Sequence, residues 1–118
     1  MATIGTYNFI NHYKGDTFKG AQFTFLNETT SSPIDLTGTE IRMQFRKGRK
    51  NGAVKATLDL TDGLTLTDAS NGILTVDPFI IDFEADVHYY DIQVTYADGT
   101  IKTYVQGKIK VIQDVTRD

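Results

Sequence analysis

Cysteine and tryptophan are absent from this 118-residue chain, which also has only two histidines and two prolines. Without cysteine the chain can form no disulfide and no thiolate metal site, so its stability must come from packing. A reducing cytoplasm suits such a composition. We expect one domain, residues 1–118, because a chain of this length can close a single hydrophobic core without covalent staples.

A large excess of charge of one sign is also missing, since the net charge is only -3. The chain therefore has no global field to gather phosphate, and nucleic acid is not expected as its principal partner. No apolar run approaches the roughly 18 residues that span a membrane. The first ten residues, MATIGTYNFI, lack the basic start, apolar run and cleavage site of a signal peptide. We expect a protein that stays in the compartment where it is made.

What the chain does have is period-two alternation of apolar and polar residues, which predicts strands with one wet face. Such strands are expected at residues 22–25, 41–46, 54–60, 64–66, 73–76, 90–96 and 101–112, with a weaker segment at 6–10. Short strands at this spacing favour a sandwich or a small barrel. The sequence therefore predicts an all-β fold.

The breaks between these strands have the chemistry of tight turns. Asparagine or aspartate followed by glycine supplies the positive φ angles that reversals require, at Asn51-Gly52, Asp62-Gly63, Asn71-Gly72 and Asp98-Gly99. The last of these predicts a hairpin between residues 90–96 and 101–105.

Two irregularities are also expected. The stretch 78–85, PFIIDFEA, is at most one short helical turn or a crossover, because proline suits a first helical turn. Gly107 interrupts the last strand, where a glycine usually marks a bulge or a bend.

Catalytic chemistry has little support in the sequence. His12 has Asp16 nearby, but no motif presents a nucleophile to them. We assign no catalytic residue and do not expect an enzyme.

The spacing of Asp82, Glu84, Asp86 and His88 could place ligands for calcium or magnesium on one side of an extended segment. It lacks the glycine-turned loop that makes a calcium motif specific. Solvated positions between apolar residues explain the same letters and are the favoured interpretation, so we assign no metal and no cofactor.

The only concentrated basic patch is RKGRK at residues 46–50, with a further arginine on the same wet face. It could bind phosphate or an acidic protein surface, and its simplest interpretation is a charged hairpin tip. Its candidate docking residues are Arg42, Arg46, Lys47, Arg49 and Lys50.

The N-terminal stretch YNFINHY, residues 7–13, is rich in aromatic residues. Residues 1–14 form either a partly extended arm or the first strand. In the first case Tyr7, Phe9 and Tyr13 are interface candidates, since aromatic rings often anchor protein interfaces. Tyr89, which points opposite to Tyr90 on its strand, has the same two interpretations.

Four segments in order carry a family resemblance: GDTFKGAQFTF at 15–25, IDLTGTEIRMQFR at 34–46, DGLTLTDASNGILTV at 62–76, and residues 89–117. Together they resemble the small β-sandwich domain of tailed-bacteriophage structural proteins, best known as the N-terminal domain of baseplate upper proteins and shared by related tail and head-decoration proteins. The most distinctive parts are the turn Asp35-Leu36-Thr37-Gly38 and the closing Asp114-Val115-Thr116-Arg117.

This resemblance implies an Ig-like antiparallel β-sandwich of about seven or eight strands. It implies a non-enzymatic virion protein, assembled in the host bacterial cytoplasm, that docks in multiple copies on other capsid or tail proteins. It implies that the protein has no membrane as a partner and no small-molecule substrate. In baseplate upper proteins a long extension with receptor-binding modules follows this domain, whereas this chain ends after its last strand. We therefore expect a stand-alone adaptor or decoration subunit, on head, portal, neck, tail or baseplate.

Two other functions stay open at this stage. A carbohydrate-binding module would use the same sandwich with coplanar exposed aromatic rings, for which the candidates are Tyr7, Tyr13, Tyr89 and Tyr104. A small hydrolase would need a pocket with perturbed carboxylates around residues 82–86.

Overall fold

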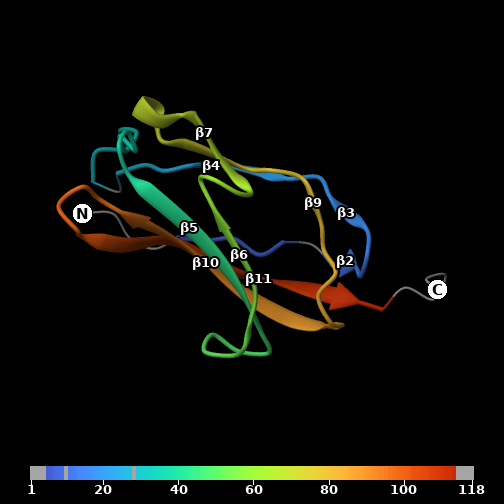
Figure 1. The fold of residues 1–118 in the computed structure, drawn as a ribbon. Helices are drawn as coiled ribbons and strands as arrows, with labels where there is room; N and C mark the ends of the chain where they lie inside the picture. Colours follow the sequence, from blue (N-terminus) through green and yellow to red (C-terminus); the bar gives the residue numbers. More distant parts are fainter. Residues whose placement is uncertain (1–4, 10, 28, 114–118) are drawn as a thin grey trace.

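The computed structural model describes residues 5–9, 11–27 and 29–113, which form two layers of β-strands (Figure 1). The larger sheet has the order β1-β11-β10-β5-β6, and β2 also pairs with β11. Its strands are β1 (Gly5–Thr6), β2 (His12–Tyr13), β5 (Glu40–Lys47), β6 (Val54–Asp59), β10 (Asp86–Thr95) and β11 (Ile101–Ile112).

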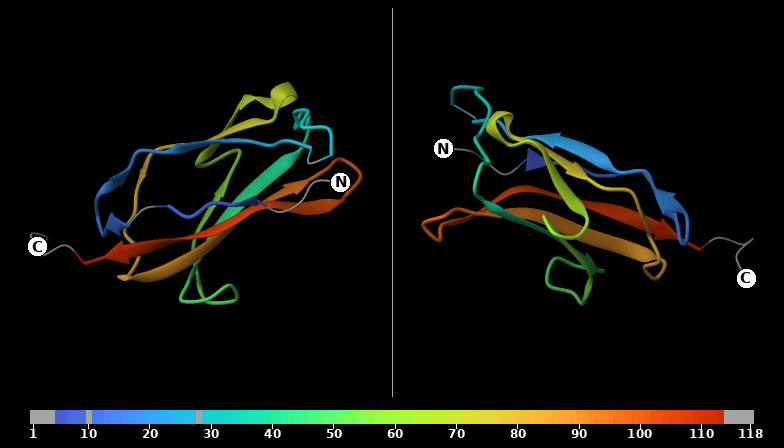
Figure 2. Two further views of the ribbon diagram at one scale, coloured as in Figure 1. Left: turned by 180° about the vertical axis from the view of Figure 1, so that it is seen from behind. Right: turned by 45° about the horizontal axis from the view of Figure 1, so that its top comes forward.

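The second layer has β8 between β4 and β7, and the pair β3-β9 extends it. Both views in Figure 2 show this layer lying over the large sheet. Its strands are β3 (Thr17–Phe18), β4 (Ala21–Thr24), β7 (Leu64–Asp68), β8 (Ile73–Val76) and β9 (Phe79–Ile80). The expected Ig-like β-sandwich is confirmed, with most neighbours antiparallel and with β1 and β2 parallel to β11.

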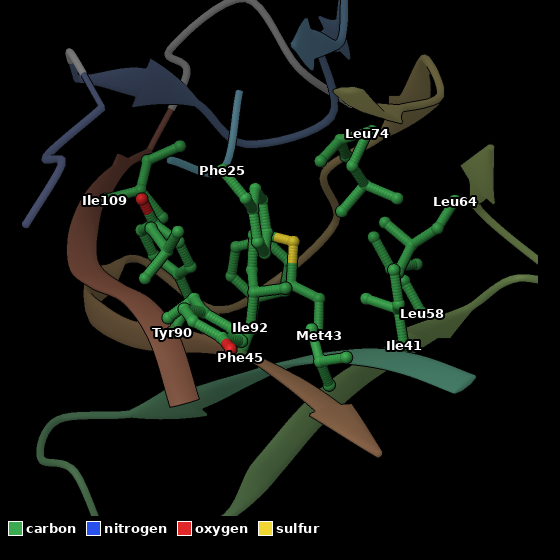
Figure 3. Close-up of a cluster of buried hydrophobic side chains, with 14 of the residues drawn as sticks. Phe25, Ile41, Met43, Phe45, Leu58, Leu64, Leu74, Tyr90, Ile92 and Ile109 are labelled. Atoms are coloured by element: carbon green, nitrogen blue, oxygen red, sulfur yellow. The ribbon is translucent and has the colours of Figure 1, made fainter. Parts of the chain in front are cut away.

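The core lies between the two layers, where the inward residues of the alternating strands meet (Figure 3). Phe45 is 1% exposed, and its ring centroid lies 5.2 Å from that of Phe83 and 5.8 Å from that of Tyr90. The second layer contributes Leu74 and Val76, which are fully buried. The period-two pattern therefore places one face of each long strand in the core.

Three of the four predicted turns have the expected positive φ, at Gly63, Gly72 and Gly99. The prediction for Gly52 is wrong, because in that hairpin Gly48 takes the positive φ, at 77°. The hairpin at Asp98-Gly99 joins β10 to β11 as predicted, with Thr95 opposite Ile101.

Of the two alternatives for residues 78–85, one short helical turn or a crossover, the structure has the crossover. That stretch is extended and includes β9, because Ile81 and Phe83 are buried while Ile80 and Asp82 are exposed. Its apolar residues thus follow the period of a strand. The one short 3₁₀ turn of the described residues is Ala69–Asn71.

A bulge or a bend was expected at Gly107, and the bulge of β11 lies three residues before it, at Tyr104. Gly107 pairs in register with Tyr90, and the register of β10 and β11 shifts where Tyr104 is left unpaired. Gly107 has a different role, because a Cβ there would lie 1.8 Å from the carbonyl oxygen of Tyr7. The N-terminal segment occupies the space that a side chain would need.

In the part of the chain that the structure describes, no helix is long and apolar enough to cross a membrane.

Candidate functional site

The outer face of the large sheet carries cross-strand rows of polar side chains. In one row Tyr89 on β10 lies between Arg46 on β5 and Lys108 on β11. In the next row Asp91 lies between Gln44 and Gln106. Neighbours in such rows lie close enough to interact with one another or with a shared ligand.

These two rows line a hollow of about 290 Å³, which we call the sheet-face hollow. Asn8 from the N-terminal segment and Lys50 from the β5–β6 hairpin border it. Its lining is Asn8, Gln44, Arg46, Lys50, Tyr89, Tyr90, Asp91, Gln106, Gly107 and Lys108. The structure thus brings three predicted candidates, Arg46, Lys50 and Tyr89, to one site.

Asp91 lines the hollow from β10 and is half-buried. Burial raises the pKa of this carboxyl, and the charges of Arg46 and Arg42 partly oppose that rise. Among the described residues, no ion pair within 4.0 Å involves Asp91. The guanidinium of Arg46 instead donates to the carbonyl oxygen of Gly52, at 2.9 Å, and to Oε1 of Gln44, at 3.4 Å.

The rest of the predicted basic patch is divided. Arg42 lies one row further along the face, where its guanidinium donates to Oε1 of Gln93 at 3.4 Å. Lys47 points elsewhere and pairs with Glu84, with 2.6 Å between Nζ and Oε2. Arg49 is exposed in the hairpin loop and does not line the hollow.

The acidic stretch does not converge on one point. Asp82 pairs with Lys14 at 3.7 Å, and Glu84 pairs with both Lys47 and Lys55. These lysines hold the pKa of Glu84 at about 2. Within the described ranges, no group of three acidic, histidine or cysteine residues could hold a metal ion.

His88, expected beside those acids, is fully buried on β10. Its Nδ1 lies 3.2 Å from the carbonyl oxygen of Asp86, and its ring centroid is 5.0 Å from that of Phe83. Its Nε2 has no hydrogen-bond partner. Burial lowers the pKa of this imidazole, so His88 is a neutral core residue at neutral pH.

A second surface lies beside the N-terminal segment. Tyr7 is 52% exposed and Phe9 is half-buried, and their rings meet edge to face at 5.0 Å. Phe23 on β4 stands 5.9 Å from Tyr7 by ring centroid. These rings line an apolar groove of about 580 Å³, which we call the edge groove, together with His12, Thr17, Phe18, Lys19, Gly20, Ala21, Gln22 and Ile109.

The sequence left open whether this N-terminal segment is an arm or a strand, and the structure combines the two. Gly5–Thr6 and His12–Tyr13 pair with β11, while residues 7–9 bind β11 without regular strand geometry. Tyr13 is exposed but lies outside the edge groove. Ile10 of the expected segment, and the closing motif at 114–117, lie outside the described residues.

The four tyrosines proposed as a sugar-binding platform do not share one. Tyr104 is only 9% exposed, and its hydroxyl hydrogen-bonds with that of Tyr96. Tyr89 belongs to the sheet-face hollow and Tyr7 to the edge groove.

Sequence reasoning missed Asp91, Gln106 and Lys108 as site residues. Their positions on wet strand faces were readable from the alternation, whereas their meeting across three strands depends on the register of the sheet.

No family model matches the chain, and no curated protein matches it. Among solved structures, it is similar to extracellular domains 3–5 of Drosophila OTK, with 21% identity and a TM-score of 0.39 over 96% of this chain and 34% of that one. It is also similar to a family 123 glycoside hydrolase from Clostridium perfringens, with 13% identity and a TM-score of 0.37 over 96% of this chain and 24% of that one. The chain thus spans about a third and a quarter of these two proteins, and TM-scores this low support no conclusion about function.

Proposed function

We propose that this chain is a non-enzymatic structural protein of a tailed-phage particle, a small adaptor or decoration subunit that docks on other capsid or tail proteins. The sequence resemblance supplies the class of particle. The observation that carries the docking role is the edge groove, in which the exposed ring of Tyr7 and the half-buried rings of Phe9 and Phe23 lie beside a strand edge that pairs with no other described strand.

Strand β4 supplies that unpaired edge. Among the described residues it pairs only with β8, with Phe23 opposite Leu74. The N–H of Phe25 donates to the carbonyl oxygen of Gly72, so the alternation of an antiparallel pair turns the backbone groups of Gln22 and Thr24 away from β8. Free backbone donors and acceptors at an edge are a template for a strand from another chain.

The rings next to this edge suit the same partner. A strand added to β4 would point alternate side chains toward Tyr7, Phe9 and Phe23, where apolar side chains can be buried. Tyrosine and phenylalanine contribute large contact areas with few rotatable bonds, which favours them as interface anchors. The partner is therefore an extended segment of a neighbouring virion protein with apolar residues at every second position.

The test is mass spectrometry of purified particles of the phage whose genome encodes the chain. We expect peptides of this chain in purified particles, at a fixed ratio to the major capsid or tail protein. Their absence from intact particles would refute the proposal.

A matched pair of variants tests the surface. Tyr7→Ser and Tyr13→Ser remove rings of equal exposure, 52%, from different places. We expect Tyr7→Ser to lower the incorporated fraction roughly fivefold or more, as loss of an interface anchor does, and Tyr13→Ser to leave it unchanged. Equal effects of the two variants would contradict docking at the edge groove.

A further inference from the structure

The sheet-face hollow is separate from the edge groove and has a different chemistry. Most of its lining side chains are polar or charged, and Asp91 among them has no ion-pair partner within 4.0 Å in the described part of the chain. A half-buried carboxylate loses part of its hydration, which costs free energy of folding when no cation is in contact with it. The stability of the fold therefore does not account for an aspartate at this position. A ligand that donates hydrogen bonds to it would compensate that cost.

The groups around Asp91 indicate the kind of donor. Gln106 beside it offers an amide with both donor and acceptor atoms, and Tyr89 in the next row offers a half-buried ring. The amide oxygen of Asn8 accepts from the backbone N–H of Lys108 at 3.1 Å, which fixes that side chain at the rim and leaves its NH₂ group to donate. Vicinal hydroxyls of a sugar ring match a carboxylate and neighbouring amides, and the ring's C–H face packs on an aromatic side chain.

The charges of the rim add a second requirement. Lys50 and Lys108 border the hollow and have no acidic partner within 4.0 Å in the described part of the chain. With Arg46 they outnumber the single carboxylate, so the lining of the hollow has a net positive charge and one acidic group. A sugar with an anionic substituent meets both requirements, because its hydroxyls can donate hydrogen bonds to Asp91 and its anionic group can pair with the two lysines.

The volume is consistent with one ring. At about 290 Å³ the hollow lies at the lower end of the roughly 300–1,000 Å³ range of small-ligand sites. We infer that the sheet-face hollow is a binding site for one residue of an acidic saccharide, in which Asp91 and Gln106 bind ring hydroxyls and Lys50 and Lys108 bind the anionic group. This site would serve the protein on any part of a particle and does not depend on docking at the edge groove.

The experiment titrates the ¹⁵N-labelled full chain with three probes and follows backbone amide shifts. The probes are methyl β-glucuronide, methyl β-glucoside, which lacks the carboxylate, and sodium acetate, which lacks the ring. We expect shifts at residues 44–46, 89–91 and 106–108, a Kd of about 1 mM for the glucuronide, and roughly tenfold weaker binding of the other two probes.

Variants on the outer face separate the roles of the residues. Asp91→Ala and Tyr89→Ala should each weaken glucuronide binding roughly tenfold, whereas Gln93→Ala, an outward residue of β10 outside the hollow, should not change it. Lys50→Ala, in an exposed loop, should weaken the glucuronide and leave the glucoside unchanged. An unaltered amide spectrum outside the site shows that each variant is folded.

Several outcomes would overturn the inference. Acetate binding as tightly as the glucuronide would reduce the hollow to a general anion site, and equal binding of glucoside and glucuronide would remove the role of the acidic group. No shift with any probe, or binding that survives both Asp91→Ala and Tyr89→Ala, would refute the site itself.

Discussion

The Tyr90 hydroxyl donates a hydrogen bond of 2.5 Å to the carbonyl oxygen of Tyr7, 83 residues away in the chain. That oxygen also lies where a Cβ of residue 107 would be. The N-terminal segment is therefore held against the sheet by a buried tyrosine on one strand and by the absence of a side chain on the next. The edge groove, which Tyr7 and Phe9 line, depends on this arrangement.

Gly107→Ala should displace the N-terminal segment, because the new Cβ would lie 1.8 Å from the Tyr7 oxygen, a backbone atom that cannot move alone. The amides of Tyr7 and Phe9 donate to the carbonyl oxygens of Gln106 and Lys108, so their hydrogen exchange should accelerate. Amide exchange measured by NMR checks this result. Lys108→Ala, which changes an exposed side chain on the same strand, is the control, and unchanged exchange in Gly107→Ala would contradict the role assigned to this glycine.

Phe45→Ala should destabilise the domain by about 3–5 kcal/mol, because it leaves a cavity beneath the rings of Phe83 and Tyr90. A loss of that size is enough to unfold a marginally stable domain. Urea unfolding followed by circular dichroism measures it. Arg49→Ala, in the exposed hairpin loop, should leave the melting temperature nearly unchanged, and a loss below about 1 kcal/mol in Phe45→Ala would show that the core can collapse around the site.

His88 should make the domain less stable as the pH falls below about 6.5. Burial lowers the pKa of this imidazole, so the unfolded chain takes up a proton that the folded chain does not. The domain has its full stability above the pKa of histidine in the unfolded chain, and it loses stability as the pH falls toward the lower pKa of His88 in the folded chain. Urea titrations between about pH 5 and pH 8 should show this slope.

His88→Leu removes the titrating group from an apolar site and should flatten the slope between those pH values. His12→Gln should keep it. A slope that is unchanged in His88→Leu would assign the effect to another group.

Glu84 should stabilise the fold at neutral pH and lose that effect in acid. Its ion pairs with Lys47 and Lys55 lower its pKa from 4.5 to about 2, so the contribution is present above about pH 4.5 and disappears as the pH falls through about 2. Glu84→Gln should therefore lower the melting temperature at pH 7 and match the wild type near pH 2. High salt should shrink the difference, because the pairs are exposed to solvent. Asp82→Asn is the control, since its partner Lys14 stands further away, at 3.7 Å.

The longer strands and three of the turns could be predicted from the sequence because their causes are local, whereas the two-residue strands β2, β3 and β9 were not expected. Alternation places Ile41, Met43 and Phe45 on one face whatever the neighbouring strand is, and glycine provides positive φ where it stands. Gly52 shows the limit of that reasoning. Two glycines, Gly48 and Gly52, lie in the same hairpin, and which one takes the positive φ depends on how the backbone pairs across it.

The candidate site was predicted in part, for a reason of the same kind. Alternation along β10 puts the interface candidate Tyr89 on the same face as Asp91, yet nothing in their own segments places Tyr89 beside Arg46 or Lys108. Those contacts follow from the register of β10 against β5 and β11, which is set by pairing over long sequence separations. Tyr104 was misjudged because the unpaired position in β11 turns its side chain into the core.

The side chain of Asn8 accepts a hydrogen bond from the backbone N–H of Lys108, one hundred positions later in the chain. Almost the whole described chain must therefore be synthesised before the N-terminal segment can pair with β11. The entropic cost of closing so long a loop slows that step. Until β11 is complete, the aromatic rings near the N-terminus stay uncovered, and a nascent or truncated chain is exposed to chaperones and to self-association at this flank.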